Sequence, residues 1–364
     1  MISRDRLRAV FSNVALLLLS LTIAFLIGEA VVRITMKDKI SLFPRYHTDA
    51  QYGDFKLRRI RPNSEFWHTS PDGSWKFEIN AQGFRNRKDF DYAKSDGVVR
   101  IISLGDSHTQ GYEVRQDFTY SAVMERYLNA RGYEAEVLNT GVSGFSTAEQ
   151  LAFFENEGIK YDPDFVVVGF YANDFEDNIK AGLFRLNESG ALSVEKTEHI
   201  PGVKIQNAIY SIPMVAWLGE NSYFYSVLFN TTWQYFKTKL AEDAAEAVVE
   251  YAIPTTEETS GYEIELSVAL LDRLHRFCGN RGIRLIILDI PTLSGESSFP
   301  PAIKDKIHEL SDGYVDSSAL LAEYVNVAEL HRPNGHRHIS EFTHTILGVN
   351  AAGQIDSWLK AGMN

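Results

Sequence analysis

The residues best suited to chemistry in this sequence stand directly after short apolar runs. Gly105-Asp106-Ser107 follows the run Val98–Leu104. A serine placed where a buried strand ends and a helix begins can expose its hydroxyl, with the positive end of the helix dipole behind it. The pattern indicates a nucleophilic serine, although a serine that merely caps a helix would have the same local sequence.

Two later runs also end in groups that could assist such a serine. Gly141 and Gly144 follow the second run, and glycines there let backbone N–H groups face a cavity. Asn173 follows the third run and offers a side-chain N–H. Donors of this kind stabilise the oxyanion that forms when a serine attacks a carbonyl, typically by about 3–4 kcal/mol each. Ordinary turns are the alternative explanation for both segments.

A cluster of histidines near the carboxyl terminus could supply the base. Four of the ten histidines lie between residues 331 and 344, and histidine is the usual base for a serine nucleophile. Zinc binding is the alternative, but no cysteine assists it, and the spacing of His336, His338 and His344 matches no common zinc pattern. The sequence therefore predicts neither a metal nor another cofactor.

These groups can meet only if the runs that carry them are strands of one sheet. Helical patterns separate the runs; one helix is predicted from Ser107 to about Gly132, and another begins with Ser146 and Glu149 in capping-box register. Alternating strands and helices predict a parallel sheet that is buried on both faces and binds ligands at its carboxyl edge. The predicted strands are residues 98–104, 135–138, 165–170 and 283–290.

Residues 179–260 interrupt this alternation. They are rich in aromatic residues, mostly at helical spacing, and they follow the carboxyl end of the third predicted strand. Because ligands bind at that edge of a parallel sheet, we interpret the segment as a helical insertion that forms a lid or substrate-binding cap. An additional helical packing layer and a patch that lies against a membrane are the alternatives.

The amino terminus is predicted to be a membrane anchor, residues 1–39. Three arginines near the start precede an uncharged apolar run over residues 10–27, which at ~1.5 Å per residue nearly spans a hydrocarbon layer of ~30 Å. No clear small-residue cleavage site follows, so we favour a retained signal anchor over a cleaved signal peptide or a buried core helix. The arginines favour an inside amino terminus. Residues 40–97, polar and rich in turns, are interpreted as a juxtamembrane segment.

The composition limits the classes of function. The 364 residues are 45% hydrophobic and 23% charged, which is typical of a folded chain. The net charge of −12 leaves no basic excess for nucleic acid, so no nucleic-acid partner is predicted. The single cysteine, Cys278, excludes an internal disulfide framework.

Taken in chain order, these groups resemble a known family. Gly105-Asp106-Ser107, Gly144, Asn173 and a late histidine resemble the four blocks of the SGNH/GDSL hydrolase superfamily, over roughly residues 98–359. The stretch Asn80–Arg85, together with an anchor, resembles bacterial envelope members. The resemblance implies a flavodoxin-like three-layer αβα sandwich over residues 98–364, with Ser107 as nucleophile. It also implies an oxyanion hole formed by the Ser107 and Gly144 amides and the Asn173 side chain.

The base departs from the family pattern. His338 fits the polar stretch that usually follows the family's histidine, while His344 and His336 are the alternative bases. If His338 is the base, Gly335 stands where the family usually has aspartate. Either a Ser–His dyad then operates or an acid from elsewhere substitutes. Tyr171 stands where the third block often has glycine, and it is expected to line or narrow the substrate pocket.

The resemblance implies a serine esterase or O-acyltransferase that works through an acyl-enzyme. The expected substrate is an acylated, in particular acetylated, glycan or lipid of the envelope, and protein partners are unknown. The chain is expected to cross the cytoplasmic membrane once through residues 10–27, with its catalytic domain facing the periplasm or exterior. The alternative function is a catalytically inactive glycan-binding or scaffold protein that kept the fold.

Overall fold

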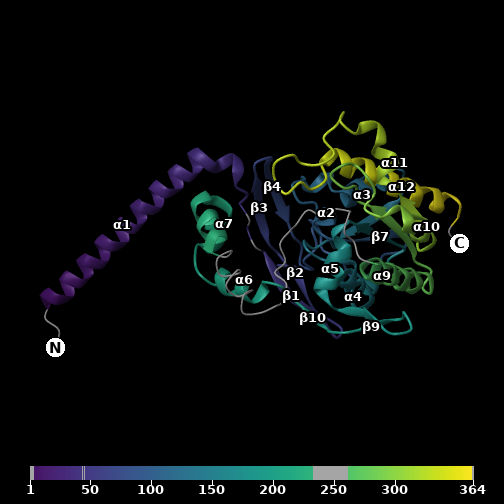
Figure 1. Ribbon diagram of the computed structural model, residues 1–364, viewed down its shortest axis with the longest axis horizontal. Coiled ribbons are helices and arrows are strands. Elements are labelled where there is room, and N and C mark those ends of the chain that lie inside the picture. The colour runs from purple at the N-terminus through teal and green to yellow at the C-terminus, as the bar shows by residue number, and fades with distance from the viewer. Residues whose placement is uncertain (1–3, 43, 45, 233–260, 363–364) are drawn as a thin grey trace.

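A five-stranded parallel sheet lies at the centre of the computed structural model, which describes residues 4–42, 44, 46–232 and 261–362 (Figure 1). Its order is β12-β11-β7-β5-β6, and every neighbouring pair runs parallel. Numbered along the chain, that is 2-1-3-4-5, the flavodoxin-like order. The predicted α/β fold with a parallel sheet is confirmed. The strands are β5 (Val98–Leu104), β6 (Glu134–Asn139), β7 (Phe165–Phe170), β11 (Arg284–Asp289) and β12 (Gly313–Val315).

The central strand shows why the apolar runs become strands. All six residues of β7 are buried, and three consecutive valines favour the extended backbone. β7 pairs with β11 on one side and β5 on the other. β7 itself carries no polar side chain, and Asn173 follows where it ends; Ser107 follows the end of the parallel strand β5 at the same edge of the sheet.

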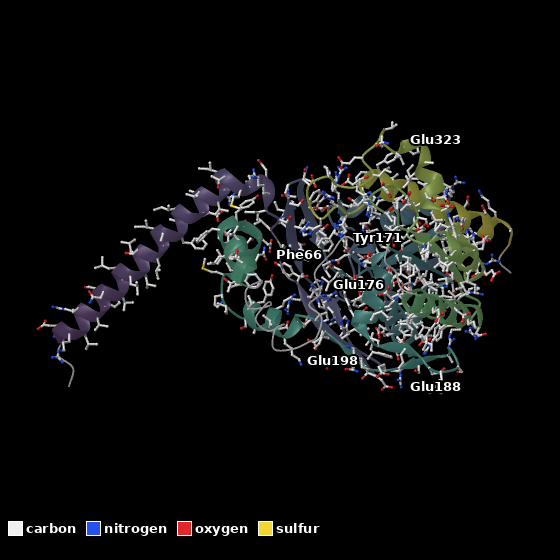
Figure 2. All side chains as sticks on the ribbon, in the orientation of Figure 1. Phe66, Tyr171, Glu176, Glu188, Glu198 and Glu323 are labelled. Carbon is white, nitrogen blue, oxygen red and sulfur yellow. The ribbon has the colours of Figure 1, made fainter. Side chains whose placement is uncertain are left out.

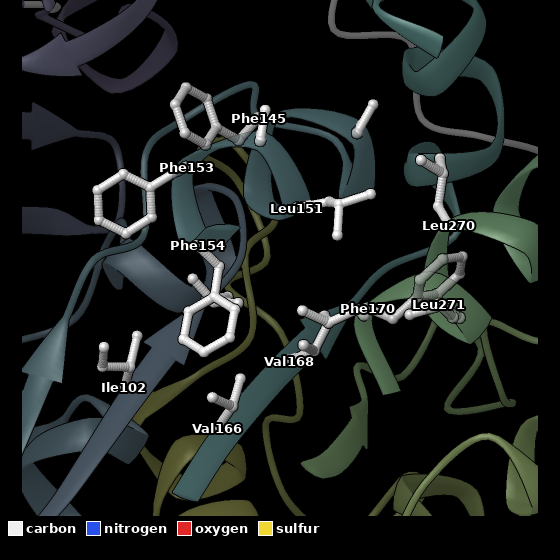
Figure 3. Packing of buried hydrophobic residues seen from close by; sticks show 14 of the residues in the cluster. Ile102, Phe145, Leu151, Phe153, Phe154, Val166, Val168, Phe170, Leu270 and Leu271 are labelled. Carbon is white, nitrogen blue, oxygen red and sulfur yellow. The ribbon is translucent and has the colours of Figure 1, made fainter. Parts of the chain in front are cut away.

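Helices cover both faces of the sheet (Figure 1). On one face, Leu151 and Phe154 of α4 and Leu270 of α9 belong to one buried hydrophobic cluster with Val166 and Val168 of β7, part of which Figure 3 shows. On the other face, side chains of α3 and α12 pack against the opposite sides of the same strands. The helices of the sandwich are α3 (Tyr120–Ala130), α4 (Thr147–Asn156), α5 (Asn173–Ala181), α9 (Gly261–Gly279), α10 (Pro301–Glu309) and α12 (Glu341–Lys360).

The first helix after β5 is shorter than predicted. α2 covers only Ser107–Gln110, because Gly111 adopts a left-handed backbone with φ +84° and ends it. A 3₁₀ turn, η2 (Gln116–Phe118), then leads into α3. The capping box at Ser146 and Glu149 is confirmed at the start of α4. Short elements elsewhere are η3 (Gly158–Tyr161), α11 (Ser317–Leu321) and η4 (Ala322–Tyr324).

A long amino-terminal helix projects from the body (Figure 1). α1 covers Arg4–Met36, and it is long and apolar enough to cross a membrane, with a mean hydropathy of 2.4 in its most apolar window. A signal sequence has the same properties. A 3₁₀ turn, η1 (Lys37–Lys39), follows it.

Residues 40–97 form two small antiparallel pairs beside the main sheet. β1 (His47–Tyr52) pairs with β2 (Phe55–Ile60), and β3 (Glu65–Ser70) pairs with β4 (Gly73–Glu78). The hairpin of β3 and β4 contacts the carboxyl-terminal loop, because Asp72 accepts hydrogen bonds from the backbone N–H groups of Asn334 and Gly335 at 2.9 and 2.6 Å. This segment therefore contacts the region that carries the candidate base.

The described part of the insertion begins with strands rather than helices. β8 (Phe184–Leu186) pairs with β9 (Leu192–Val194), and β10 (Glu198–His199) adds to β2. Helices α6 (Val203–Tyr210) and α7 (Val215–Asn221) follow. The remainder of the predicted insertion, residues 233–260 with Trp233, Tyr235 and Phe236, lies outside the described residues.

The insertion contacts the last turns of α1. The Glu29 carboxylate accepts hydrogen bonds from the Ser222 hydroxyl at 2.7 Å and from the Phe224 backbone N–H at 2.9 Å. Arg33 donates to the backbone carbonyl of Asn221 at 2.8 Å. Polar contacts thus join the long helix to the insertion.

Candidate active site

The turn between β5 and α2 holds Ser107 at the carboxyl edge of the sheet. Gly105 has φ +154°, and a Cβ there would lie 1.8 Å from Thr109 Oγ1, so the turn requires glycine. The Asp106 carboxylate caps α2 by accepting from the His108 N–H at 2.8 Å. Ser107, the first residue of α2, is left 6% exposed.

His338 lies against this serine. Its Nε2 is 2.8 Å from Ser107 Oγ, which is hydrogen-bonding distance. The loop that carries it is fixed from both sides, since the His338 carbonyl accepts from the Arg332 N–H at 2.8 Å and the Ile339 N–H donates to His108 Nδ1 at 3.4 Å. The candidate nucleophile and the candidate base, which are far apart in the sequence, are therefore in direct contact.

The two alternative bases lie elsewhere. His344, in the first turns of α12, is fully buried, and its Nδ1 accepts from the Tyr120 N–H at 3.0 Å. Burial lowers the pKa of His344 to about 3. The His336 ring lies 6.1 Å from the His338 ring and 5.4 Å from the His68 ring, centroid to centroid. In this arrangement only His338, among the three candidates, has a hydrogen bond to Ser107 within the described residues.

The loop that carries Gly144 packs against the first turn of α2. The Val142 N–H donates to the Gly105 carbonyl at 3.1 Å, and the Ser143 N–H donates to Gln110 Oε1 at 2.8 Å. Gly144 has φ +73°, in the left-handed region that favours glycine. The second block therefore lies beside the serine turn.

Asn173 begins α5 and also reaches the serine turn. Its side-chain Nδ2 donates to Asp106 Oδ2 at 3.4 Å and to Asp177 Oδ2 at 3.0 Å. Burial raises the pKa of Asp177 to about 6 and raises that of Asp106 as well. An oxyanion would have to replace one of these two carboxylates as the acceptor for the Asn173 amide.

Tyr171, which is labelled in Figure 2, directly follows β7 and lies close to the same turn. It is 8% exposed, and its ring centroid is 4.3 Å from that of His108, the neighbour of Ser107. Burial raises the pKa of its hydroxyl to about 12, so the hydroxyl stays protonated near neutral pH. The ring therefore packs beside the serine turn, at the end of β7.

Sequence reasoning missed Glu113. This side chain is 0% exposed, and its Oε2 lies 3.8 Å from His338 Nδ1. Burial alone would raise the pKa of Glu113, but interactions with His338 and Ser70 and the His336 N–H outweigh burial and hold it well below its usual value. The only local signal was an acidic residue six positions after Ser107 in an apolar stretch, Tyr112-Glu113-Val114.

The described ranges contain no group of three or more histidine, cysteine, aspartate or glutamate side chains arranged to hold a metal ion. The arrangement of Ser107, His338 and the neighbouring amides is instead suited to nucleophilic attack on a carbonyl, because a hydroxyl, an imidazole and N–H donors meet at one edge.

Comparison with known proteins gives a family match and several distant relatives. The family described as GDSL-like lipase/acylhydrolase matches residues 103–354. An arylesterase from Vibrio mimicus is 24% identical over 132 residues, which cover 33% of this chain and 66% of that relative. The chain thus aligns with slightly less than two thirds of the curated relative's length.

The solved structures with similar folds include carbohydrate esterases. An acetylxylan esterase from Geobacillus stearothermophilus is 16% identical, with a TM-score of 0.40, over 71% of this chain and 93% of that one. A two-domain esterase active on acetylated mannans is 11% identical, with a TM-score of 0.38, over 71% of this chain and 49% of that one.

Proposed function

The chain belongs to the GDSL-like lipase/acylhydrolase family, and we propose that it is a serine esterase that cleaves acyl esters through an acyl-enzyme on Ser107. The family match supports the acyl-ester chemistry. The observation that carries the assignment of residues is the distance of 2.8 Å between Ser107 Oγ and His338 Nε2. A hydroxyl in contact with an imidazole is the arrangement that activates a serine at neutral pH.

The proposed reaction has two halves. His338 Nε2 takes the proton of Ser107 as Oγ attacks the ester carbonyl, and the oxyanion is stabilised by the backbone N–H groups of Ser107 and Gly144 and by the Asn173 amide. His338 then gives its proton to the departing alcohol, which leaves the acyl group on Ser107. In the second half, water deprotonated by His338 attacks this acyl-enzyme, the bond between the acyl carbon and Ser107 Oγ breaks, and His338 returns its proton to Oγ as the acid leaves.

The proposed substrate carries small acyl groups such as acetyl. Ser107, His108 and Tyr171 are all less than a tenth exposed, so little room remains for a long acyl chain beside the nucleophile. A glycan or lipid of the envelope is the proposed carrier of these groups. If a sugar hydroxyl rather than water resolves the acyl-enzyme, the same site performs O-acyl transfer.

The proposed location is the cytoplasmic membrane, which α1 would cross once. Residues 1–39 would form the anchor, residues 40–97 a segment next to the membrane, and residues 98–364 the catalytic domain with its insertion at about 179–260. The arginines at the start of α1 support an inside amino terminus. The catalytic domain would then face the periplasm or exterior.

The proposal is tested with the full chain in detergent and p-nitrophenyl acetate as substrate. Ser107→Ala and His338→Ala should each lower kcat by at least about 10³-fold, because each removes one partner of the nucleophile pair. Ser121→Ala, which truncates a buried serine of α3, is the matched control and should retain wild-type turnover.

Equal turnover by the wild type and Ser107→Ala would contradict the proposal and would favour the inactive glycan-binding or scaffold protein. A second measurement separates hydrolysis from transfer. An added oligosaccharide acceptor diverts acetyl from water to sugar only if the enzyme is an acyltransferase.

A further inference from the structure

We propose that Glu113 is the acid that positions the His338 imidazole, so that Ser107, His338 and Glu113 act as a triad whose acid comes from the segment after the nucleophile. The inference rests on the proposed esterase function. It assigns the third member, for which the expected position before the histidine offers only Gly335.

The first argument is that two polar atoms face each other without other partners. His338 Nε2 is occupied by Ser107 Oγ, so Nδ1 is the ring nitrogen left to be oriented. Within the described part of the chain, His338 Nδ1 and Glu113 Oε2 are both buried and have no hydrogen-bond partner, and they lie 3.8 Å apart. Hydrogen bonds of this type are often long in unliganded enzymes and shorten when substrate binds.

The second argument is that the Glu113 carboxylate is held in place. Its Oε1 accepts from the His336 N–H at 3.0 Å, and Ser70 of β3 also bonds to it. Its own backbone carbonyl accepts from Arg332 Nε at 3.1 Å. Anchors from the hairpin and from the carboxyl-terminal loop therefore converge on one fully buried side chain.

The third argument is backbone strain at the same residue. Glu113 has φ +59°, a left-handed conformation that is unfavourable for a residue with a long side chain. Strain of this kind persists where the surrounding structure enforces it, often at functional sites. Here the enforced conformation directs the carboxylate to His338.

The fourth argument is steric exchange with Gly335. A Cβ at position 335 would lie 1.8 Å from Glu113 Oε1 and 2.6 Å from Ser70 Oγ. The space that an aspartate side chain would need at this position is already filled by the Glu113 carboxylate. The Glu113 carboxylate therefore takes the place that the side chain of the expected aspartate would occupy.

These positions give Glu113 a definite role. A carboxylate facing Nδ1 keeps the proton of the neutral imidazole on that nitrogen, so that Nε2 is free to accept the Ser107 proton. The same carboxylate stabilises the imidazolium that forms during attack. Other ionisable groups surround His338, but the carboxylate that faces Nδ1 is that of Glu113. The others are Asp106, His68, His108, Tyr112, His331, His336 and His344.

The test is Glu113→Gln in the full chain in detergent, with p-nitrophenyl acetate. The glutamine carbonyl can still accept from the His336 N–H, but its amide would donate to Nδ1 and favour the wrong imidazole tautomer. We expect kcat to fall about 10³- to 10⁴-fold with little change in KM. Glu155→Gln, which breaks the ion pair with Arg273 on α9, is the control and should keep wild-type kinetics.

Two further variants distinguish positioning from folding. Gly335→Ala keeps the Glu113 charge but pushes the carboxylate away, so kcat should fall in this variant as well. Glu113→Ala combined with Gly335→Asp returns a carboxylate to the loop three residues before His338, and we expect it to recover at least about tenfold of the kcat lost in Glu113→Ala.

The outcomes separate this inference from the proposed function. If Glu113→Gln keeps wild-type kcat while Ser107→Ala and His338→Ala are inactive, Glu113 is not the positioning acid and the esterase proposal stands. If the wild type does not exceed Ser107→Ala, the esterase proposal fails and the triad falls with it.

Discussion

Buried histidines near Ser107 differ in what their ring nitrogens contact. His108 Nδ1 accepts from the Ile339 N–H, and His344 Nδ1 accepts from the Tyr120 N–H. Burial lowers the pKa of both rings, so both remain neutral at pH 7. His338 differs because it lies between a hydroxyl and a carboxylate. The neighbouring rings therefore act as neutral acceptors and packing surfaces around His338, the proposed base.

His344 predicts a pH dependence of stability. Unfolded histidine takes up a proton below about pH 6.5, whereas buried His344 stays neutral until about pH 3. The unfolded chain thus binds the extra proton as the pH falls through this window, and His344 lowers the free energy of unfolding by about 1 kcal/mol per pH unit. His344→Gln keeps an acceptor for the Tyr120 N–H without titrating. Thermal unfolding should show a smaller loss of Tm between pH 7 and pH 5 in this variant, and an unchanged loss would contradict the assignment.

The residues that sequence reasoning identified are those fixed by strand ends. Ser107 and Asn173 directly follow strands that apolar runs reveal, so their meeting at one edge follows from a parallel sheet. Glu113 was not identified from the sequence, because it follows no strand end and because its partner, His338, is far away along the chain. Only the three-dimensional path of the loop from Gly111 to Val114 directs this carboxylate to His338.

At the scale of elements, the turn after β5 is the feature on which the site depends. Gly105 permits the turn, and Arg85 supports the segment beyond α2 by donating to the Gln110 carbonyl at 2.9 Å and the Val114 carbonyl at 2.8 Å. Arg85 is buried, and its guanidinium lies over the ring of Phe77, which links this segment to strand β4. The candidate nucleophile Ser107 and the candidate acid Glu113 therefore lie on one short stretch of chain, residues 105–114, that Arg85 holds in place.

Gly105→Ala tests the turn. The added Cβ would meet the Thr109 side chain at 1.8 Å in a backbone region that alanine avoids. We expect turnover of p-nitrophenyl acetate to fall at least about 100-fold through displacement of Ser107, with a lower Tm. Gly132→Ala is the matched control, since Gly132 also has a positive φ of +90° but has nothing within 4 Å of the added Cβ. Comparable activities of the two variants would show that the tight turn is not required.

The elements that were predicted are those with a strong local signal. β5 and β7 have the predicted bounds, because β7 is apolar throughout and β5 is mostly apolar and β-branched, with only Arg100 and Ser103 as polar residues. β12 has only three residues, and it is recognisable only through its pairing with β11. The single helix predicted after Ser107 was wrong, because the left-handed Gly111 divides it. The early part of the insertion forms strands, because β8 pairs with β9 and β10 pairs with β2, and no local sequence pattern indicates the distant partner β2.

At the scale of the whole molecule, the helix α1 predicts membrane attachment of the intact chain. Its apolar side chains are largely exposed on the described surface, so they need another apolar environment. The full chain should sediment with membranes and resist an alkaline wash, whereas a chain lacking residues 1–39 should be released. Amino-terminal sequencing of the membrane-bound protein checks retention of the helix. A released protein that begins beyond residue 27 would instead identify a cleaved signal peptide.

The link between α1 and the insertion continues toward the catalytic loop. Glu29 joins α1 to the segment after α7, and Glu220 of α7 accepts from the Trp67 N–H of β3 at 3.1 Å and bonds to Tyr46. The hairpin that begins with β3 reaches the loop before His338 through Asp72. If α1 spans a bilayer, this series of contacts connects the membrane helix to the catalytic loop as a rigid link rather than a flexible tether. The candidate active site would then stay at a fixed distance from the lipid headgroups. A substrate that lies closer to the membrane or farther from it would have to move to that distance to react.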